Sequence, residues 1–155
     1  MTLTGKPWAE IKRIKTCGVF VVGEIVYVAA SSRTIPGFEI DSEPILKVDR
    51  NGPLSALGNA VLTALDSFRS DVEPPDPRAR RKSPLLGPTG FRSWKQFETN
   101  ALHVRVHLDH NIFVTPTARD TEHGGYLHRP DLECECSTEA LDIGKTLLKA
   151  LALCT

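Results

Sequence analysis

The feature that most constrains the fold of this chain is an internal repeat. Residues 1–69 align with residues 87–155 without a gap when the sequence is shifted by 86 positions, and nine of the 69 pairs are identical. Average composition alone gives about four identities, so the order of the structural signals carries more weight than the count. The signals that recur are a tryptophan, an arginine after a strand, a proline and a glycine within a helix (Trp8 and Trp94, Arg33 and Arg119, Pro44 and Pro130, Gly58 and Gly144). This pattern predicts two copies of one supersecondary unit.

Each copy begins with a predicted pair of strands. Residues 103–108 alternate histidine or arginine with valine or leucine, which is the two-residue period of a strand with one buried face. Residues 109–111, Asp-His-Asn, suit a tight turn, because Asp and Asn tolerate turn conformations. The apolar residues 112–116 then return as the second strand.

A third strand and a helix complete the predicted copy. Residues 131–136, Asp-Leu-Glu-Cys-Glu-Cys, alternate so that Glu133 and Glu135 point to one face of a strand. The helix that follows, and its counterpart after Pro53, each carry one apolar stripe. Gly58 and Gly144 lie in the middle of these helices, where glycine costs about 1 kcal/mol relative to alanine. Their recurrence predicts that each helix closely approaches the sheet or the other helix.

These elements predict an α+β fold of two pseudo-repeated halves, each a β-meander plus a helix. The helices pack on one side of the antiparallel sheet or sheets, since each has a single apolar stripe. We expect one compact domain overall, with the first half in 1–69, a Pro/Arg-rich linker in 70–88 and the second half in 89–155.

The predicted linker contains a basic cluster, Arg78, Arg80, Arg81 and Lys82. Four cations within five residues can contact nucleic acid. However, no aromatic side chain is interleaved with them for base stacking, and 19 Lys and Arg balance 19 Asp and Glu in the chain. We therefore favour a solvated linker, and expect no direct binding of nucleic acid.

Composition limits the other classes of protein. The 155 residues are 41% hydrophobic and 25% charged, as in ordinary globular proteins. The N-terminal residues lack the apolar core of a signal peptide, and the apolar runs are too short or too interrupted to span a bilayer. Four cysteines without an export signal indicate reduced thiols. We expect a cytoplasmic protein that does not bind a membrane.

The cysteines raise the question of a metal site. Zinc requires four ligands held tetrahedrally, whereas Cys134 and Cys136 on one strand lie about 6.6 Å apart along the chain. His103 and His107 alternate toward the opposite face. We expect Cys134, Cys136 and Cys154 to be core residues, with no metal and no cofactor, and a melting temperature that a chelator leaves unchanged.

Signals of catalysis are sparse. The chain lacks a P-loop, a dinucleotide-binding fingerprint, a nucleophile elbow and an H-E-x-x-H motif. His123 and His128 flank a Gly124-Gly125 pair that could form an anion-binding nest of backbone amides. A small hydrolase or a nucleic-acid-modifying enzyme that uses these histidines is therefore the alternative to a protein without catalytic activity, which we favour.

The candidate binding residues are acidic. Glu39, Asp41 and Glu43 occupy alternate positions beside Phe38, and Glu133 and Glu135 alternate in the second half. Alternating carboxylates next to an aromatic anchor suit a basic protein partner. The alternative is a solvated loop. In the gapless alignment Val19 and Val21 match Arg105 and His107, which predicts a strand that is apolar on both faces and covered by the linker, another protomer or a partner.

Several segments resemble the immunity proteins of bacterial contact-dependent growth inhibition systems. The segments are SWKQFETNALHVRV, IFVTPTAR, GGYLHRPDLECE and IGKTLLKAL, all within residues 93–155. The resemblance implies a small cytoplasmic protein that binds one toxin C-terminal domain, often a nuclease, and blocks it stoichiometrically. These families share no fixed binding motif, so the resemblance assigns no site residue.

Overall fold

The computed structural model describes residues 8–11, 13–79 and 82–155, and its strands form one eight-stranded sheet. The first half comprises α1 (Trp8–Ile11), β1 (Lys15–Val22), β2 (Ile25–Thr34), β3 (Glu39–Asp49) and α2 (Leu54–Asp66). The connection comprises β4 (Arg69–Val72), the 3₁₀ turn η1 (Pro77–Ala79) and α3 (Leu86–Thr89). The second half comprises α4 (Trp94–Asn100), β5 (Leu102–Asp109), β6 (Asn111–Arg119), β7 (Tyr126–His128), the 3₁₀ turn η2 (Pro130–Leu132), β8 (Cys134–Cys136) and α5 (Ala140–Ala152).

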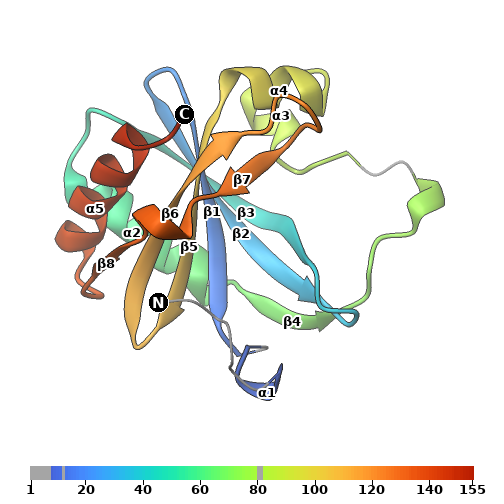
Figure 1. Cartoon of the computed structure of the whole chain (residues 1–155), viewed down its shortest axis with the longest axis horizontal. Coiled ribbons are helices and arrows are strands. Elements are labelled where there is room, and N and C mark those ends of the chain that lie inside the picture. The colour runs from blue at the N-terminus through green and yellow to red at the C-terminus, as the bar shows by residue number, and fades with distance from the viewer. Residues whose placement is uncertain (1–7, 12, 80–81) are drawn as a thin grey trace.

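The sheet order confirms the α+β fold with two repeated halves. The strands run β3-β2-β1-β5-β6-β7, so the two halves meet at the antiparallel pair β1–β5. β8 pairs with β6. β4 pairs in parallel with the C-terminal end of β2, at residues 32–34, past the residues of β2 that pair with β1. The bounds of α5 are those of α2 shifted by 86. In Figure 1 α2 and α5 lie together at one side of the sheet, as their apolar stripes predicted.

The expected gapless alignment is wrong by one residue in the first strand. Two residues, Gly23 and Glu24, join β1 to β2, whereas His110 alone joins β5 to β6. β1 therefore matches β5 with a shift of 87, and the elements after the hairpin match with a shift of 86. Gly18 both pairs with Arg105 and corresponds to it at a shift of 87, so the pseudo-twofold axis passes through this pair. His110 has the positive φ of 65° that so short a turn requires.

The corrected register changes the residue correspondence behind the predicted two-faced apolar strand, but β1 is buried on both faces as expected. Val19 and Val21 correspond to Val106 and Leu108, and both valines lie in the main core beneath α2 and α5. Phe20 points to the other face, where it packs in a second cluster with Leu85, Leu86 and Phe97. The end of the predicted linker therefore covers this face, as one of the three expected alternatives.

The two helical glycines mark a close crossing of α2 and α5. A Cβ added at Gly58 would lie 1.8 Å from the carbonyl oxygen of Ala140, and one added at Gly144 would lie 2.1 Å from that of Leu54. Leu54 and Ala140 are the first residues of the two helices, so each glycine lies against the backbone at the N-terminus of the other helix. This confirms the expected close approach and identifies the other helix as its target.

Two arginines repeat the same structural role in both halves. The guanidinium of Arg33 donates to the carbonyl of Ile11 at the end of α1. Arg119 donates from Nε to the carbonyl of Glu98 and from Nη2 to that of Ala101, at the end of α4, over 3.0 and 2.9 Å. Cationic side chains suit the carbonyl ends of helices. The aligned arginines therefore anchor the short helix that precedes each sheet half.

The third strand differs between the halves. β3 is continuous, and its register with β2 shifts at Ala29/Ala30, opposite residues 43–44. The predicted strand 131–136 is shorter than expected, because Pro130 begins the 3₁₀ turn η2 and strand pairing starts only at Cys134. Proline fixes φ and lacks an N–H donor, which favours such a break. Pro44 thus lies at the register shift of β3, and Pro130 lies at the start of the 3₁₀ turn η2.

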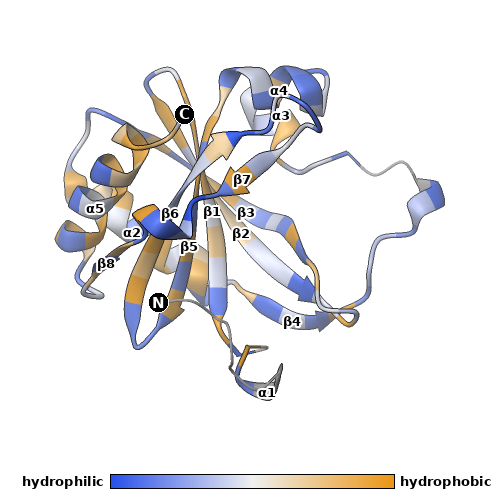
Figure 2. Cartoon of the chain, viewed as in Figure 1, coloured by the Kyte–Doolittle hydropathy of each residue, from blue (hydrophilic) through white to orange (hydrophobic). Residues whose placement is uncertain are grey.

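Part of the connection between the halves packs against the sheet. Leu85 and Leu86 are buried, and α3 packs near α4, while η1 projects away from the sheet (Figure 1). Figure 2 shows apolar residues in the central strands and hydrophilic residues in η1. Residues Arg80 and Arg81 of the basic cluster lie outside the described residues. In the described part of the chain, no helix is both long and apolar enough to cross a membrane.

Candidate functional site

A cavity of about 590 Å³ lies on the face of the sheet opposite α2 and α5. Residues of β1, β2, β3 and β5 line its floor, β7 and α4 contribute its walls, and residues 75 and 82–84 of the connection border it. The lining side chains that are charged, titratable or aromatic include Glu39, Asp41, Trp94, His103, Arg105 and His128. Both halves of the repeat therefore contribute to one site.

Small residues at the centre of the sheet keep this cavity open. Gly18 lies beside Arg105 in the β1–β5 pair, and a Cβ at Gly18 would meet the ring of Phe20 at 3.0 Å. With no side chain at Gly18, Arg105 extends over β1 and β2 toward β3. Three strand spacings span about 14 Å in a flat sheet, so this reach requires long side chains and a curved sheet.

Glu39 is the internal counter-ion of two arginines. Its Oε1 accepts from Arg33 Nη2 at 2.5 Å and from Arg105 Nη2 at 2.8 Å. Burial by itself would raise the pKa of Glu39, but the charges and hydrogen bonds of Arg105 and Arg33 together bring that pKa below its ordinary value. The sequence suggested an exposed acid for a partner, whereas this carboxylate is already paired within the fold.

Asp41 faces the same cavity without such a partner. No hydrogen bond or ion pair joins its carboxylate to any described residue, although protein atoms surround it on the cavity floor. Burial and, to a smaller extent, the negative charge of Glu39 raise the pKa of Asp41 to about 6. At neutral pH the cavity therefore contains one ionised carboxylate that no described residue pairs.

The histidines of the cavity are neutral at neutral pH. Burial, with a smaller contribution from His128, lowers the pKa of His103 to about 3. The His103 ring stacks on Phe20 with centroids 4.3 Å apart, and its Nδ1 lies 3.2 Å from the carbonyl oxygen of Val19. Because that carbonyl can only accept, Nδ1 carries the proton. Burial and the nearby Arg105 likewise lower the pKa of His128.

The other predicted binding residues lie outside this cavity. Phe38 is 51% exposed in the β2–β3 turn, and Glu43 is exposed at the register shift of β3. Glu133 and Glu135 belong to the opposite edge of the sheet, where Thr115 donates to Glu133 at 3.3 Å and Asn111 donates to Glu135 at 2.9 Å. The structure thus separates the two acidic segments by the width of the sheet.

The histidines proposed for an enzyme do not form one cluster. His128 lines the cavity, whereas His123 lies on the exposed β6–β7 turn with Nδ1 3.4 Å from an Asp120 carboxylate oxygen. Gly124 and Gly125 both have positive φ, of 80° and 82°, in that turn. The same Asp120 carboxylate accepts from the backbone N–H groups of Glu122 and His123, so it serves to close the turn.

The thiols belong mainly to the core. All four cysteines are free, Cys17 is buried, and Cys136 and Cys154 pack against the main core. Cys134 is only partly buried at the β8 edge, where its Sγ lies 3.5 Å from the carbonyl of Leu132. Among the described residues, no group of three or more His, Cys, Asp or Glu side chains could hold a metal ion.

Sequence reasoning missed the convergence of the two halves on one cavity. It assigned His103 and Arg105 to the outer face of β5 and Glu39 to a loop, without connecting them. The alternation in β5 was a usable signal, because it places His103 and Arg105 on one face. That β1 and β5 are neighbours, so that Arg105 can reach Glu39, depends on tertiary structure.

Comparison with known proteins yields matches at the level of structure. No family model matches the chain, and no curated protein sequence matches it. A protein of unknown function from Neisseria meningitidis aligns over 93% of this chain and 97% of its own, with a TM-score of 0.72 and 16% identity. A chain of the CdiA-CT/CdiI toxin and immunity complex from Yersinia pseudotuberculosis aligns over 92% of this chain and 98% of its own, with a TM-score of 0.73 and 15% identity. The chain therefore shares its whole fold with both of these proteins.

Proposed function

We propose that this protein is an immunity protein that binds a cognate toxin domain and neutralises it stoichiometrically. The observation that carries the proposal is the full-length fold match to a chain of a toxin and immunity complex. The segments in residues 93–155 that resemble immunity proteins of contact-dependent growth inhibition systems support it independently. The partner is a toxin C-terminal domain, and we propose a nuclease, because its cationic groove for phosphates would complement carboxylates.

We propose that the first-half segment around the β2–β3 turn contacts this partner. Phe38, in the β2–β3 turn, supplies an exposed aromatic anchor, and Glu43 supplies an exposed carboxylate on β3. Phe38 immediately precedes β3 and Glu43 lies on it, and β3 contributes Glu39 and Asp41 to the cavity. Glu39 is excluded as a contact, since its charge is taken up by Arg33 and Arg105. Glu133 and Glu135 remain a second candidate surface on the opposite edge.

Co-expression and direct binding test the proposal together. A toxin C-terminal domain sought in the gene neighbourhood of this protein is expressed in cells with or without this protein, and complex formation is measured with the purified proteins. We expect protection by the wild type and a one-to-one complex. Phe38→Ala should weaken the affinity about tenfold, as truncation of an interface anchor does. Glu43→Lys should slow association and reduce its dependence on salt.

The controls separate binding from folding and one surface from the other. Asp66→Lys alters an exposed carboxylate at the end of α2, on the other side of the sheet, and should leave binding unchanged. Glu135→Lys tests the opposite edge. If that variant loses binding while Phe38→Ala and Glu43→Lys retain it, the contact lies on the second surface. If the wild type gives neither protection nor a complex, the immunity function is wrong.

A further inference from the structure

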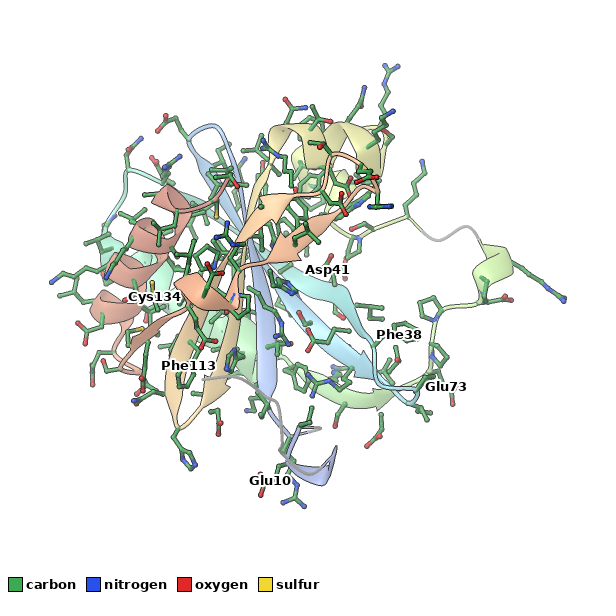
Figure 3. All side chains as sticks on the ribbon, viewed as in Figure 1. Glu10, Phe38, Asp41, Glu73, Phe113 and Cys134 are labelled. Atoms are coloured by element: carbon green, nitrogen blue, oxygen red, sulfur yellow. The ribbon has the colours of Figure 1, made fainter. Side chains whose placement is uncertain are left out.

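We propose that the cavity receives one cationic side chain of the partner, an arginine or a lysine, and that the carboxylate of Asp41 is its counter-ion. This rests on the proposed function only for the identity of the partner. Figure 3 places Asp41 on the inner part of β3, with Phe38 at the outer end of the β2–β3 hairpin. The cation would therefore insert behind the exposed contact residues.

The first argument is the contrast between two carboxylates on one strand. Glu39 and Asp41 lie two residues apart on the same face of β3, and both line the cavity. Glu39 bonds two guanidinium groups, while Asp41 has no bonded partner among the described residues. A carboxylate withdrawn from water is unfavourable unless it is paired. A cation that enters the cavity would supply that pairing.

The second argument is the charge of the surrounding groups. Glu39 shares its single charge between Arg33 and Arg105, and burial and the charge of Glu39, rather than any cation, set the direction of the Asp41 pKa shift. His103 and His128 are neutral at pH 7, because burial lowers the pKa of each. Lys82 is exposed at the border, and no ion pair joins it to Asp41. The carboxylate of Asp41 is thus the charge on the cavity floor that a ligand could complement.

The third argument is the remaining lining. Trp94 presents an indole ring to the cavity, and its Nε1–H donates to Glu98, which holds the ring in place. Cations bind favourably over the faces of aromatic rings, and tryptophan is the strongest such partner. A volume of about 590 Å³ falls within the range of ordinary ligand sites, so a side chain with its alkyl stem can be accommodated.

A titration with a small cation tests the site without the toxin. N-methylguanidinium chloride is added to the full chain while the carboxyl carbon and backbone resonances of Asp41 are followed by NMR, with sodium chloride as the matched salt. We expect saturable shifts at Asp41 and at the Trp94 indole, and their loss in Asp41→Asn. Asp66→Asn, which removes an exposed carboxylate outside the cavity, should retain them. Absence of saturable shifts in the folded wild type would overturn the cation site.

Binding of the toxin domain then decides the source of the cation. Asp41→Asn should weaken the complex at least about 30-fold, because it removes one member of a desolvated ion pair, while Asp66→Asn should leave affinity within about threefold. If Asp41→Asn binds the toxin domain as tightly as the wild type, the partner does not insert a cation here, although the immunity function stands. If the wild type forms no complex, the immunity function fails, and the N-methylguanidinium titration still judges the cation site.

The variant Lys82→Ala tests the chain's own cation as the occupant. If the partner supplies the cation, removal of Lys82 leaves the toxin affinity unchanged or strengthens it, since a competitor has been removed. If Lys82 itself occupies the cavity in solution, Lys82→Ala shifts the Asp41 resonances of the free protein as strongly as N-methylguanidinium does. That second result, with no change in toxin affinity on Asp41→Asn, would overturn the proposal.

Discussion

Glu39 and Asp41 are two acidic residues on one face of β3 whose pKa values shift in opposite directions. Their side chains differ by one methylene group, and both lie on the cavity floor, largely shielded from bulk water. Two arginines lower the pKa of Glu39, whereas burial and the neighbouring Glu39 raise that of Asp41. The difference follows from the partners that the fold brings to each carboxylate. It makes Glu39 a structural residue and leaves Asp41 available to a ligand.

The first prediction concerns the stability of Asp41→Asn as a function of pH. Asp41 has a pKa of about 6 in the folded protein and 3.8 as its ordinary value, so the folded state holds this proton more tightly than the unfolded chain. Ionisation therefore costs stability as the pH rises through this window, and the cost vanishes at lower pH. At pH 7.5 we expect Asp41→Asn to be about 1–3 kcal/mol more stable than the wild type.

Urea unfolding at several pH values checks this expectation. The advantage of Asp41→Asn should shrink steadily between pH 6 and pH 4, and Asp66→Asn should show no such dependence. An Asp41→Asn variant that is less stable than the wild type at pH 7.5 would show that the carboxylate already has a stabilising partner in the free protein.

At the scale of elements, the crossing of α2 and α5 depends on two glycines. Each glycine lies against the backbone of the first residue of the other helix, so no side-chain rotation can relieve an added methyl group. Helix propensity favours alanine over glycine by about 1 kcal/mol, yet both helices keep glycine at this position. Close packing of the helix pair therefore outweighs local propensity here.

The second prediction follows from this crossing. Gly58→Ala and Gly144→Ala should each lower the free energy of unfolding by about 3 kcal/mol or more, because the two backbones must separate to admit the Cβ atom. Asn59→Ala, at the exposed neighbouring position of α2, should be neutral or slightly stabilising. Thermal and urea unfolding of the three variants provide the measurement. Stable glycine variants would mean that the helices cross at a greater distance.

For the whole molecule, an ion-pair network joins the two halves on the face that lacks α2 and α5. Arg105 of β5 reaches Glu39 of β3 across β1 and β2, and Glu39 also holds the buried Arg33. The network thus connects the second half to the outer strand of the first half, while the two helices connect the halves on the opposite face. The cavity lies within this arrangement, so its shape depends on both halves.

The third prediction is a coupling across the halves. Glu39→Gln should lower the free energy of unfolding by about 2–3 kcal/mol, because it leaves Arg33 without its counter-ion. This is less than the cost of breaking a fully buried pair, because Glu39 and Arg105 are partly exposed to solvent. In a double-mutant cycle with Arg105→Met, we expect a coupling energy of about 1 kcal/mol, measured by urea unfolding at low salt. Effects of Glu39→Gln and Arg105→Met that simply add would place the two side chains out of contact in solution.

Much of the fold could be predicted from the sequence, because local periodicity encodes it. The alternation in residues 103–108, the apolar stripes of the two C-terminal helices and the paired glycines indicated an α+β repeat with helices on one side. The side chains of Glu39 and Asp41 were also singled out by their alternation. Such features depend on neighbouring residues along the chain, so an isolated sequence reveals them.

Tertiary structure decided the register, the cavity and the charges within it. The hairpin turn is one residue shorter in the second half. A gapless alignment therefore offsets β1 from β5 by one residue and assigns every side chain of that strand to the wrong face of the sheet. The pairing of β1 with β5 then brings Arg105 to Glu39, while Asp41 has no bonded partner in the described part of the chain. Ion pairing and burial depend on distances in space between residues far apart in the chain, and these exist only once the two halves have joined.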